Sequence, residues 1–242
     1  LDTEGPKLIV AGAGSGKTRV LTTKLAYIIS ETRAWPHQIL CVTFTNKAAK
    51  EMQNRVREFL KGEKSAVAWL RNFDYISDKL MIRHEEALGF KSNFTILDTD
   101  DQNKLIKKIC VAENIDAKKI SPQFIISFID NCKNKGLMHD EVEVKKISTL
   151  EKQIWKVYTI YQKKTQDLNA MDFGDLILFT VKLFENNNDI AEIYRKNFKY
   201  ILVDEYQDTN FIQNKWLNLL VNSNQNICCV GDDDQSIYSW RG

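Results

Sequence analysis

The sequence predicts an α/β protein in which a parallel sheet, covered by helices, is interrupted by a mostly helical insertion. Two observations lead to this prediction. Short, apolar and often β-branched runs that end in turn residues occur at four places, and such runs are typical of parallel strands buried on both faces. Between the second and the third of them, residues from about 94 to 174 contain few strand-like runs and much helical amphipathicity.

In chain order, the predicted strands cover residues 8–10, 39–44, 200–203 and 227–230. Helical patterns follow the first three at residues 20–29, 47–60 and 211–221, and Gly231 with a run of aspartates follows the fourth. In the second of these helices, apolar or small residues recur at helical spacing, namely Ala48, Met52, Val56 and Phe59. This alternation of strand and helix favours an α/β architecture.

The insertion is predicted to contain helices at residues 105–112, 122–131 and 150–168. Ser121 and Pro122 predict the start of the second helix, with the serine as N-cap and the proline in the first turn. Residues 133–136 are expected to form a connector, and the run 186–188 of three asparagines a loop. We therefore predict a first α/β segment at 1–92, a helical insertion at 93–174 and a second α/β segment at 175–242.

The composition is that of a folded protein with a sizeable core. Its 242 residues are 43% hydrophobic and 10% aromatic, and 34 basic against 32 acidic residues give a net charge of +2. This balance does not indicate a nucleic-acid-binding protein, although it leaves room for a local basic groove. Since no run approaches the roughly 20 apolar residues of a membrane span and no signal peptide opens the sequence, we expect no membrane partner and a cytoplasmic location.

Neither cysteine nor histidine spacing indicates a metal site. The cysteines form no C-x-x-C pair and are odd in number, so we expect neither a disulfide framework nor a zinc site. We expect instead that the protein resides in a reducing compartment. The five cysteines are Cys41, Cys110, Cys132, Cys228 and Cys229. The three histidines lie far apart. The sequence begins at Leu1 rather than Met and ends at Gly242 without a tail, so we expect a fragment.

A phosphate-binding loop is the strongest local signal. The segment Ala11-Gly12-Ala13-Gly14-Ser15-Gly16-Lys17-Thr18 fits the P-loop template, with Ala11 in the place of the usual glycine, and it stands between a predicted strand and a predicted helix. Glycines let successive backbone N–H groups turn toward phosphate oxygens, and the helix N-terminus adds partial positive charge. The spacing of the glycines in residues 11–18 does not fit the dinucleotide fingerprint G-x-G-x-x-G.

These observations predict ATP and Mg²⁺ as ligands. Lys17 can reach the β- and γ-phosphates, and the Thr18 hydroxyl can ligate Mg²⁺. The residues predicted to bind the nucleotide are Ala11, Gly12, Ala13, Gly14, Ser15, Gly16, Lys17, Thr18 and Arg19.

An acidic pair, Asp204 and Glu205, ends the predicted strand at 200–203. In a P-loop protein this is the Walker B arrangement, in which Asp204 holds Mg²⁺, generally through water, and Glu205 orients and deprotonates the attacking water. A solvated strand end is the alternative interpretation, and the upstream phosphate loop favours the catalytic one.

Longer motifs resemble one family. Three segments resemble motifs of the UvrD/Rep/PcrA group of superfamily 1 DNA helicases and occur in the same order along the chain. They are TFTNKAA at 43–49, DEYQDTN at 204–210 and VGDDDQSIYSWRG at 230–242. NFTILD at 93–98 and MDFGDL at 171–176 resemble the flanks of that family's helical insertion. The resemblance implies a RecA-like P-loop NTPase domain with a helical insertion, running along essentially the whole chain.

The resemblance also implies roles for single residues. In this family ATP binds between two motor domains, and its hydrolysis moves the protein along single-stranded DNA, usually 3′ to 5′. Carried onto this sequence, Lys17, Glu205 and Gln235 are catalytic, with Gln235 sensing the γ-phosphate. The implied DNA-binding residues are Phe44, Asn46, Tyr238, Trp240 and Arg241.

Alternatives stay open at some of these positions. An aromatic ring can stack on any base, which favours DNA contact; a core position on a strand end is the alternative interpretation for Phe44. The run Asp232-Asp233-Asp234 lacks the spacing and distal glutamate of a calcium loop, so we interpret it as a turn that positions Gln235.

Three departures from the family pattern bear on activity. The adenine-contacting motif is expected upstream of Leu1, and the second motor domain, with its arginines, after Gly242. Residues 72–75 stand where relatives carry a DNA-contacting Thr-Phe-His-Ser segment, and the negative charge of Asp74 there would oppose binding of the DNA phosphates.

We therefore expect the N-terminal part of an ATP-dependent helicase that acts on single-stranded DNA and ss/ds junctions and needs its C-terminal motor domain. On its own, the chain is expected to hydrolyse ATP poorly and to unwind nothing. A non-catalytic ATP- or DNA-binding remnant is the alternative, and a RecB-like helicase-nuclease subunit fits less well. Repair, replication restart and plasmid replication all use motors of this family, and the sequence does not choose among them.

Overall fold

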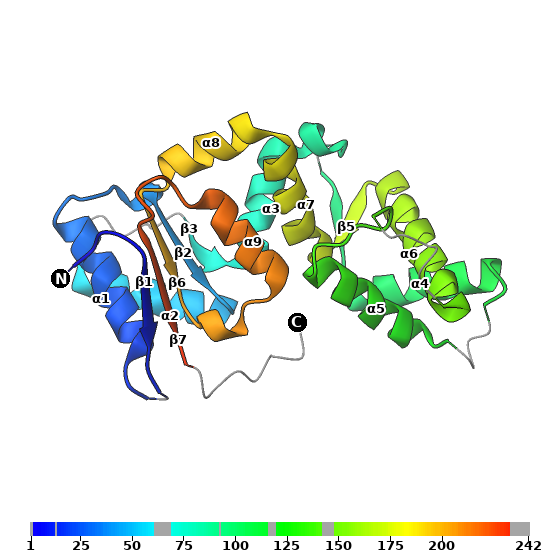
Figure 1. Ribbon diagram of the computed structural model, residues 1–242, viewed down its shortest axis with the longest axis horizontal. Helices are drawn as coiled ribbons and strands as arrows, with labels where there is room; N and C mark the ends of the chain where they lie inside the picture. Colours follow the sequence, from blue (N-terminus) through cyan, green and yellow to red (C-terminus); the bar gives the residue numbers. More distant parts are fainter. Residues whose placement is uncertain are drawn as a thin grey trace. The chain divides into compact units, whose positions relative to one another are not determined.

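The structure is a computed structural model that describes residues 2–12, 14–60, 69–91, 93–115, 120–141 and 148–232 (Figure 1). It divides into two compact units. The α/β unit comprises the described residues within Leu1–Ser77, Val181–Thr209 and Gln213–Trp240, and the helical unit those within Asp78–Thr180 together with Asn210–Ile212. The main segment of the helical unit runs from Asp78 to Thr180, and the bounds of 93–174 for the insertion stay a prediction.

A parallel sheet forms the centre of the α/β unit. Among the described residues it has five strands in the order β1-β7-β6-β2-β3, namely β1 (Lys7–Val10), β7 (Ile227–Gly231), β6 (Tyr200–Val203), β2 (Ile39–Thr43) and β3 (Trp69–Asn72). Four of these strands are predicted from the sequence, and β3 is not. The structure thus confirms the α/β class with its parallel sheet.

The register of the strands brings their carboxyl ends to one edge of the sheet. Val10 lies opposite Gly231, and Thr43 lies opposite Asn72. Val203, between them, pairs with both β2 and β7. Loops that follow these strands therefore meet at this edge, where parallel α/β sheets bind their ligands.

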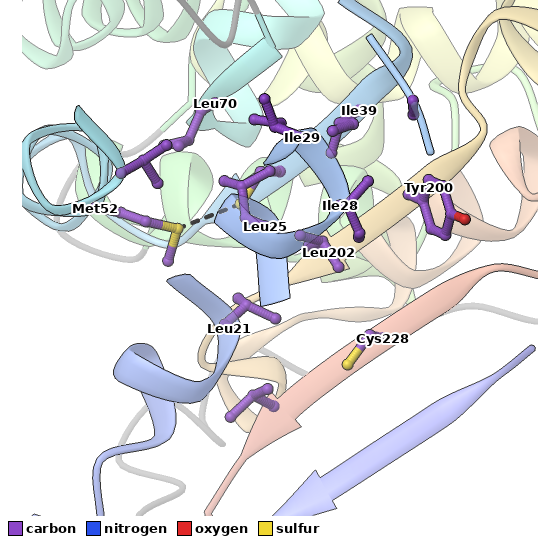
Figure 2. Packing of buried hydrophobic residues seen from close by; sticks show 14 of the residues in the cluster. Leu21, Leu25, Ile28, Ile29, Ile39, Met52, Leu70, Tyr200, Leu202 and Cys228 are labelled. Atoms are coloured by element: carbon purple, nitrogen blue, oxygen red, sulfur yellow. Dashed lines mark hydrogen bonds between the residues drawn. The ribbon is translucent and has the colours of Figure 1, made fainter. Parts of the chain in front are cut away.

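Helices cover both faces of the sheet. In the core cluster drawn in Figure 2, Leu25 of α1 (Lys17–Ser30) and Met52 of α2 (Asn46–Phe59) pack with Cys41 of β2 and Leu70 of β3. On the opposite face, the ring of Trp69 meets Tyr194 of α8 (Asn188–Asn197) edge-on, with the two ring centroids 6.3 Å apart. Adjacent residues of β3 thus serve opposite faces, as strand geometry requires. The helices with residues in this unit are α1 (Lys17–Ser30), α2 (Asn46–Phe59), α3 (Phe73–His84), α7 (Phe173–Asn186), α8 (Asn188–Asn197), α9 (Phe211–Leu220) and the 3₁₀ turns η1 (Pro36–Gln38) and η4 (Tyr206–Asp208).

The helical unit is built on α4 (Thr99–Ala112), α5 (Pro122–Asn134) and α6 (Thr149–Asp167). Two short strands, β4 (Thr95–Leu97) and β5 (Ala170–Asp172), pair in parallel, and the 3₁₀ turn η2 spans Glu85–Leu88. The Ser121 Oγ accepts a hydrogen bond of 3.2 Å from the Phe124 N–H, which confirms the predicted start of α5. The three helices share a core that includes Ile106, Ile109, Ile125, Ile129, Ile154 and Tyr158.

Two local predictions differ from the structure. The connector predicted at residues 133–136 begins only at Lys135, since α5 continues through Lys133, whose side chain is fully buried in ion pairs, to Asn134. The asparagine run at 186–188 was expected to be a loop. Instead Asn186 ends α7 and Asn188 begins α8, because Asn187 closes α7 through bonds from its backbone N–H and its side-chain amide to the Leu183 carbonyl oxygen.

A buried charged cluster organises the helical unit around the start of α7. Lys133 Nζ lies 2.6 Å from Asp172 Oδ2 and 2.7 Å from Asp175 Oδ1, and all three side chains are fully buried. Tyr161 and Gln162 of α6 donate to Asp172 and Asp175, respectively. The two carboxylates also accept each other's backbone N–H groups at 3.0 and 3.1 Å, which caps α7.

One cation serves two carboxylates in this cluster, and this imbalance changes their pKa values. Burial and the charge of Asp172 raise the pKa of Asp175 to about 6. Burial opposes ionisation of Asp172 too, but the charge of Lys133 and the hydrogen bonds keep its pKa below the ordinary value. The folded protein therefore binds the Asp175 proton more tightly than the unfolded chain does.

We expect Asp175→Asn to flatten the pH dependence of stability. Because the folded pKa of Asp175 lies above its ordinary 3.8, the free energy of unfolding falls as pH rises from about 4 to about 6 and then levels. Across this window the wild type should lose on the order of 1–3 kcal/mol relative to Asp175→Asn, measured by urea unfolding at several pH values. Asp167→Asn, at an exposed carboxylate ending α6, is the matched control. Parallel curves for wild type and Asp175→Asn would contradict the prediction.

Candidate nucleotide-binding site

The phosphate loop connects β1 to α1 at the carboxyl edge of the sheet. Gly14 and Gly16 have φ of 70° and 88°, a region in which side chains with a Cβ are strained. The Ala11 N–H donates to the Gly231 carbonyl at 3.1 Å, which ties the start of the loop to β7. Ala13 lies outside the described residues. Both glycines thus hold conformations that let the loop turn into the N-terminus of α1.

A hollow of about 430 Å³ opens at this N-terminus. It is lined by Gly14, Ser15, Gly16, Arg19, Val20 and Thr23. The first N–H groups of a helix have no partner within the helix and carry partial positive charge, and Arg19 adds a full charge. The hollow therefore combines donors and positive charge suited to phosphate.

Lys17 does not point freely into solvent. Its side chain is 8% exposed, and Nζ lies 2.7 Å from Oδ2 of the buried Asp232 at the end of β7. Asp232 is predicted from the sequence to be part of a turn, and nothing in the local sequence predicts its pairing with a residue 215 positions away. This ion pair places the ammonium group beside the phosphate loop with its charge balanced.

Thr18 and Asp204 come together beside Lys17. The Thr18 hydroxyl donates to Asp204 Oδ2 at 3.2 Å, and Asp204 is only 3% exposed. Burial, followed by the charge of Glu205, raises the pKa of Asp204 to about 6. Its Oδ1 is buried without a hydrogen-bond partner among the residues the structure describes. A buried carboxylate oxygen that lacks a donor, next to a hydroxyl, fits the oxygen ligands that Mg²⁺ prefers.

Glu205 adopts a backbone conformation that is uncommon for its residue type. Its φ and ψ are 51° and 48°, in the left-handed region, immediately before η4. The Glu205 Oε2 accepts a hydrogen bond of 2.7 Å from Gln207 Nε2. The carboxylate that the sequence analysis predicts to be the base is therefore held by a side chain two residues further along.

Gln207 is a second residue that the sequence analysis did not single out. Its Oε1 accepts the Asp232 N–H at 3.0 Å, so it contacts both the Walker B turn and the end of β7. The only sequence signal was its place inside the DEYQDTN motif, where no role was assigned to it.

The residues expected to meet DNA are only partly within the described chain. Phe44 follows β2 at the carboxyl edge and is half-buried, and the exposed Asn46 begins α2, which Thr45 caps by accepting the Ala48 N–H at 3.1 Å. Tyr238, Trp240, Arg241 and the predicted phosphate sensor Gln235 lie outside the described residues, as do Asp233 and Asp234.

The segment at residues 72–75 crosses from β3 into α3. The Asn72 Oδ1 accepts the Tyr75 N–H at 3.1 Å, and Asp74 occupies the first turn of the helix, where a negative charge is favourable. The ring of Phe73 is buried and meets Trp216 edge-on at 5.6 Å. Helix initiation and core packing thus account for these residues in the structure.

Two further features concern compartment and membrane. All five cysteines lie in the described chain, where they are buried and free. Within the same described ranges, no helix combines the length and the apolar character needed to cross a membrane.

Comparison with known proteins identifies the family of the chain. The family model for the UvrD/REP helicase N-terminal domain matches residues 1–242. The chain is 45% identical over 240 residues to the ATP-dependent DNA helicase PcrA of Staphylococcus epidermidis and 44% identical to that of Staphylococcus aureus. These alignments cover 99% of this chain and 33% of each relative, so the chain spans about a third of the length of the curated relatives it matches. The chain therefore belongs to the UvrD/REP helicase N-terminal domain family.

Proposed function

We propose that this chain is the N-terminal, ATP-binding part of an ATP-dependent DNA helicase. In this proposal it couples ATP hydrolysis to 3′–5′ movement along single-stranded DNA and to unwinding at ss/ds junctions. The observation that carries the proposal is the meeting of the phosphate loop with Asp204 and Glu205 at one sheet edge, in a chain of this family. We place its action in the cytoplasm and assign the missing arginine contacts to a C-terminal motor domain.

In the proposed reaction, Lys17 exchanges its ion pair with Asp232 for the β- and γ-phosphates. Mg²⁺, held by Thr18 and Asp204, would neutralise charge on the phosphates. Glu205 takes the proton of the attacking water, and Gln235 senses the γ-phosphate. Phe44, Asn46, Tyr238, Trp240 and Arg241 contact single-stranded DNA in this proposal; the position of Phe44 and Asn46 beside the end of β2 supports it.

Lys17→Ala should weaken ATP binding about 10- to 100-fold, since a charge-assisted contact to phosphate is worth roughly 1.5–3 kcal/mol. A titration with a fluorescent ATP analogue measures this effect. Lys50→Ala, at an exposed position of α2, should leave the affinity unchanged. Equal affinities for Lys17→Ala and wild type would remove the phosphate loop from the proposal.

Trp240→Ala should weaken single-stranded DNA binding by about 1–3 kcal/mol, because one base would lose its stacking partner. Fluorescence anisotropy with a labelled oligonucleotide measures the change. Trp35→Ala is the matched control, since Trp35 is 60% exposed and precedes β2, at the other edge of the sheet. An effect no larger than that of the control would assign Trp240 a structural role instead.

Steady-state ATP hydrolysis separates the motor from the non-catalytic alternative. We expect slow hydrolysis by this chain, and DNA-stimulated hydrolysis once the C-terminal two thirds of a PcrA relative are joined to it. Hydrolysis by neither protein, with both folded, would favour the non-catalytic ATP- or DNA-binding remnant.

A further inference from the structure

We propose that Gln207 is a positioning residue for ATP hydrolysis: it holds the Glu205 carboxylate with one atom of its amide and the end of β7 with the other. This inference rests on the proposed function, because it assigns Gln207 a task in the reaction of that site. It adds a residue for which the sequence motifs gave no role.

The hydrogen bonds define the orientation of the Gln207 amide. Its Nε2 donates to Glu205 Oε2 at 2.7 Å, and its Oε1 accepts the Asp232 N–H at 3.0 Å. A carboxylate can only accept and a backbone N–H can only donate, so a flipped amide would lose both bonds at once. The Gln207 side chain therefore satisfies an acceptor after β6 and a donor after β7 at the same time.

Glu205 needs such support because its backbone is unusual. A residue with a side chain in the left-handed region costs free energy, on the order of 1–3 kcal/mol, and persists where its surroundings hold it. The η4 turn provides part of this support, since the Asp208 N–H donates to the Glu205 carbonyl at 3.0 Å. The carboxylate itself is held by Gln207.

The Gln207 amide lies very close to Gly231 at the end of β7. A Cβ added to Gly231 would lie 2.8 Å from Gln207 Oε1, closer than real Cβ contacts come, while its next neighbour, the Gln207 backbone nitrogen, would lie at 3.4 Å. Gly231 is not among the glycines with positive φ, so a side chain here would leave the backbone unstrained and would act by displacing the Gln207 amide.

The contacts form one polar chain from the phosphate loop to the base. Lys17 Nζ meets Asp232 Oδ2, the Asp232 N–H meets Gln207, and Gln207 meets Glu205. Since Gln207 is anchored on the backbone N–H of Asp232 rather than on its carboxylate, this anchor does not depend on the Lys17 ion pair. When Lys17 moves to a phosphate, Gln207 therefore keeps the base in place.

The test measures single-turnover ATP hydrolysis and ATP affinity for this chain and its variants. Gln207→Ala should lower the hydrolysis rate about 10- to 100-fold and change the affinity less than 3-fold, because the base is misplaced while the phosphate contacts stay. Gln207→Glu keeps the acceptor for the Asp232 N–H but sets a carboxylate against Glu205, so it should not rescue the rate. Gln53→Ala is the matched control, because the half-buried Gln53 donates to the Leu70 carbonyl at 2.9 Å, away from the site.

A double-mutant cycle with Gly231 separates positioning from a general loss of structure. Gly231→Ala should slow hydrolysis by displacing the Gln207 amide, and the double variant Gly231→Ala/Gln207→Ala should be no slower than Gln207→Ala. Additive effects of the two changes, or a Gln207→Ala rate within 3-fold of the wild type, would overturn the proposal.

If the wild-type chain hydrolyses ATP no faster than the Glu205→Gln variant, that rate would count against the proposed hydrolysis by this chain. Crystal structures of the wild type and of Gln207→Ala then test the role of Gln207 separately, through the position of the Glu205 carboxylate. A displaced carboxylate in Gln207→Ala supports the positioning role, and an unchanged one overturns it.

Discussion

Glu205→Gln should lower the rate of ATP hydrolysis by about 10²- to 10⁴-fold, which is the usual contribution of a positioned general base. Glutamine has nearly the same shape as glutamate, and its amide oxygen can still accept the bond from Gln207 Nε2, so the turn should keep its structure. ATP affinity should therefore stay within about 3-fold of the wild type. The measurement is single-turnover ATP hydrolysis in the presence of single-stranded DNA, with the chain joined to a relative's C-terminal part. We expect the wild-type rate to be highest under these conditions, so a large decrease can be measured.

Glu51→Gln is the matched control for this experiment, since Glu51 is exposed on α2. It should change neither rate nor affinity. A Glu205→Gln rate above a tenth of the wild-type rate would mean that another group takes the proton. A large loss of affinity would instead show that Glu205 acts on binding.

Lys133→Met should lower the free energy of unfolding by about 3–5 kcal/mol. Methionine fills a similar volume but leaves two fully buried carboxylates, Asp172 and Asp175, without their cation. The two carboxylates also cap α7, so their repulsion acts at the start of a helix. Urea unfolding at pH 7, followed by circular dichroism, measures the loss.

The triple variant Lys133→Met/Asp172→Asn/Asp175→Asn should recover most of this loss, because it removes the uncompensated charge together with the cation. Lys164→Met, at an exposed position of α6, controls for the loss of a lysine as such and should change stability by less than about 0.5 kcal/mol. A decrease in the free energy of unfolding below about 1 kcal/mol for Lys133→Met alone would show that the charge of the two carboxylates is compensated in some other way.

The strands were predictable where apolar residues run on without interruption. β2 and β6 are buried at every position, so a parallel sheet covered on both faces could be inferred from their sequences. β3 was missed because its second half, Arg71 and Asn72, is polar and only four residues pair. α7 was also missed, because residues 176–181 form a short, fully buried and mostly apolar run, and such a run cannot be assigned to helix or strand from periodicity alone.

The candidate site was predictable where its chemistry is local in the sequence. The phosphate loop and the pair of Asp204 and Glu205 are short motifs, and the spacing of their residues indicates which chemistry they would carry, although their roles stay predictions. The partners of these residues were not predictable. Asp232 meets Lys17, and Gln207 reaches the end of β7, only because β7 lies between β1 and β6.

By itself, the sequence determined the fold class, because it depends on local periodicity, and it predicted a helical insertion and the residues that would carry the chemistry, because these follow from periodicity and short motifs. Only the tertiary structure decided which of these residues touch. Strand order sets the ion pair of Lys17 with Asp232 and the hydrogen bond of Gln207 to the Asp232 N–H, and the packing of α5 against the start of α7 buries Lys133 with two carboxylates. These contacts join residues from 25 to 215 positions apart, and a one-dimensional pattern does not encode which strands become neighbours.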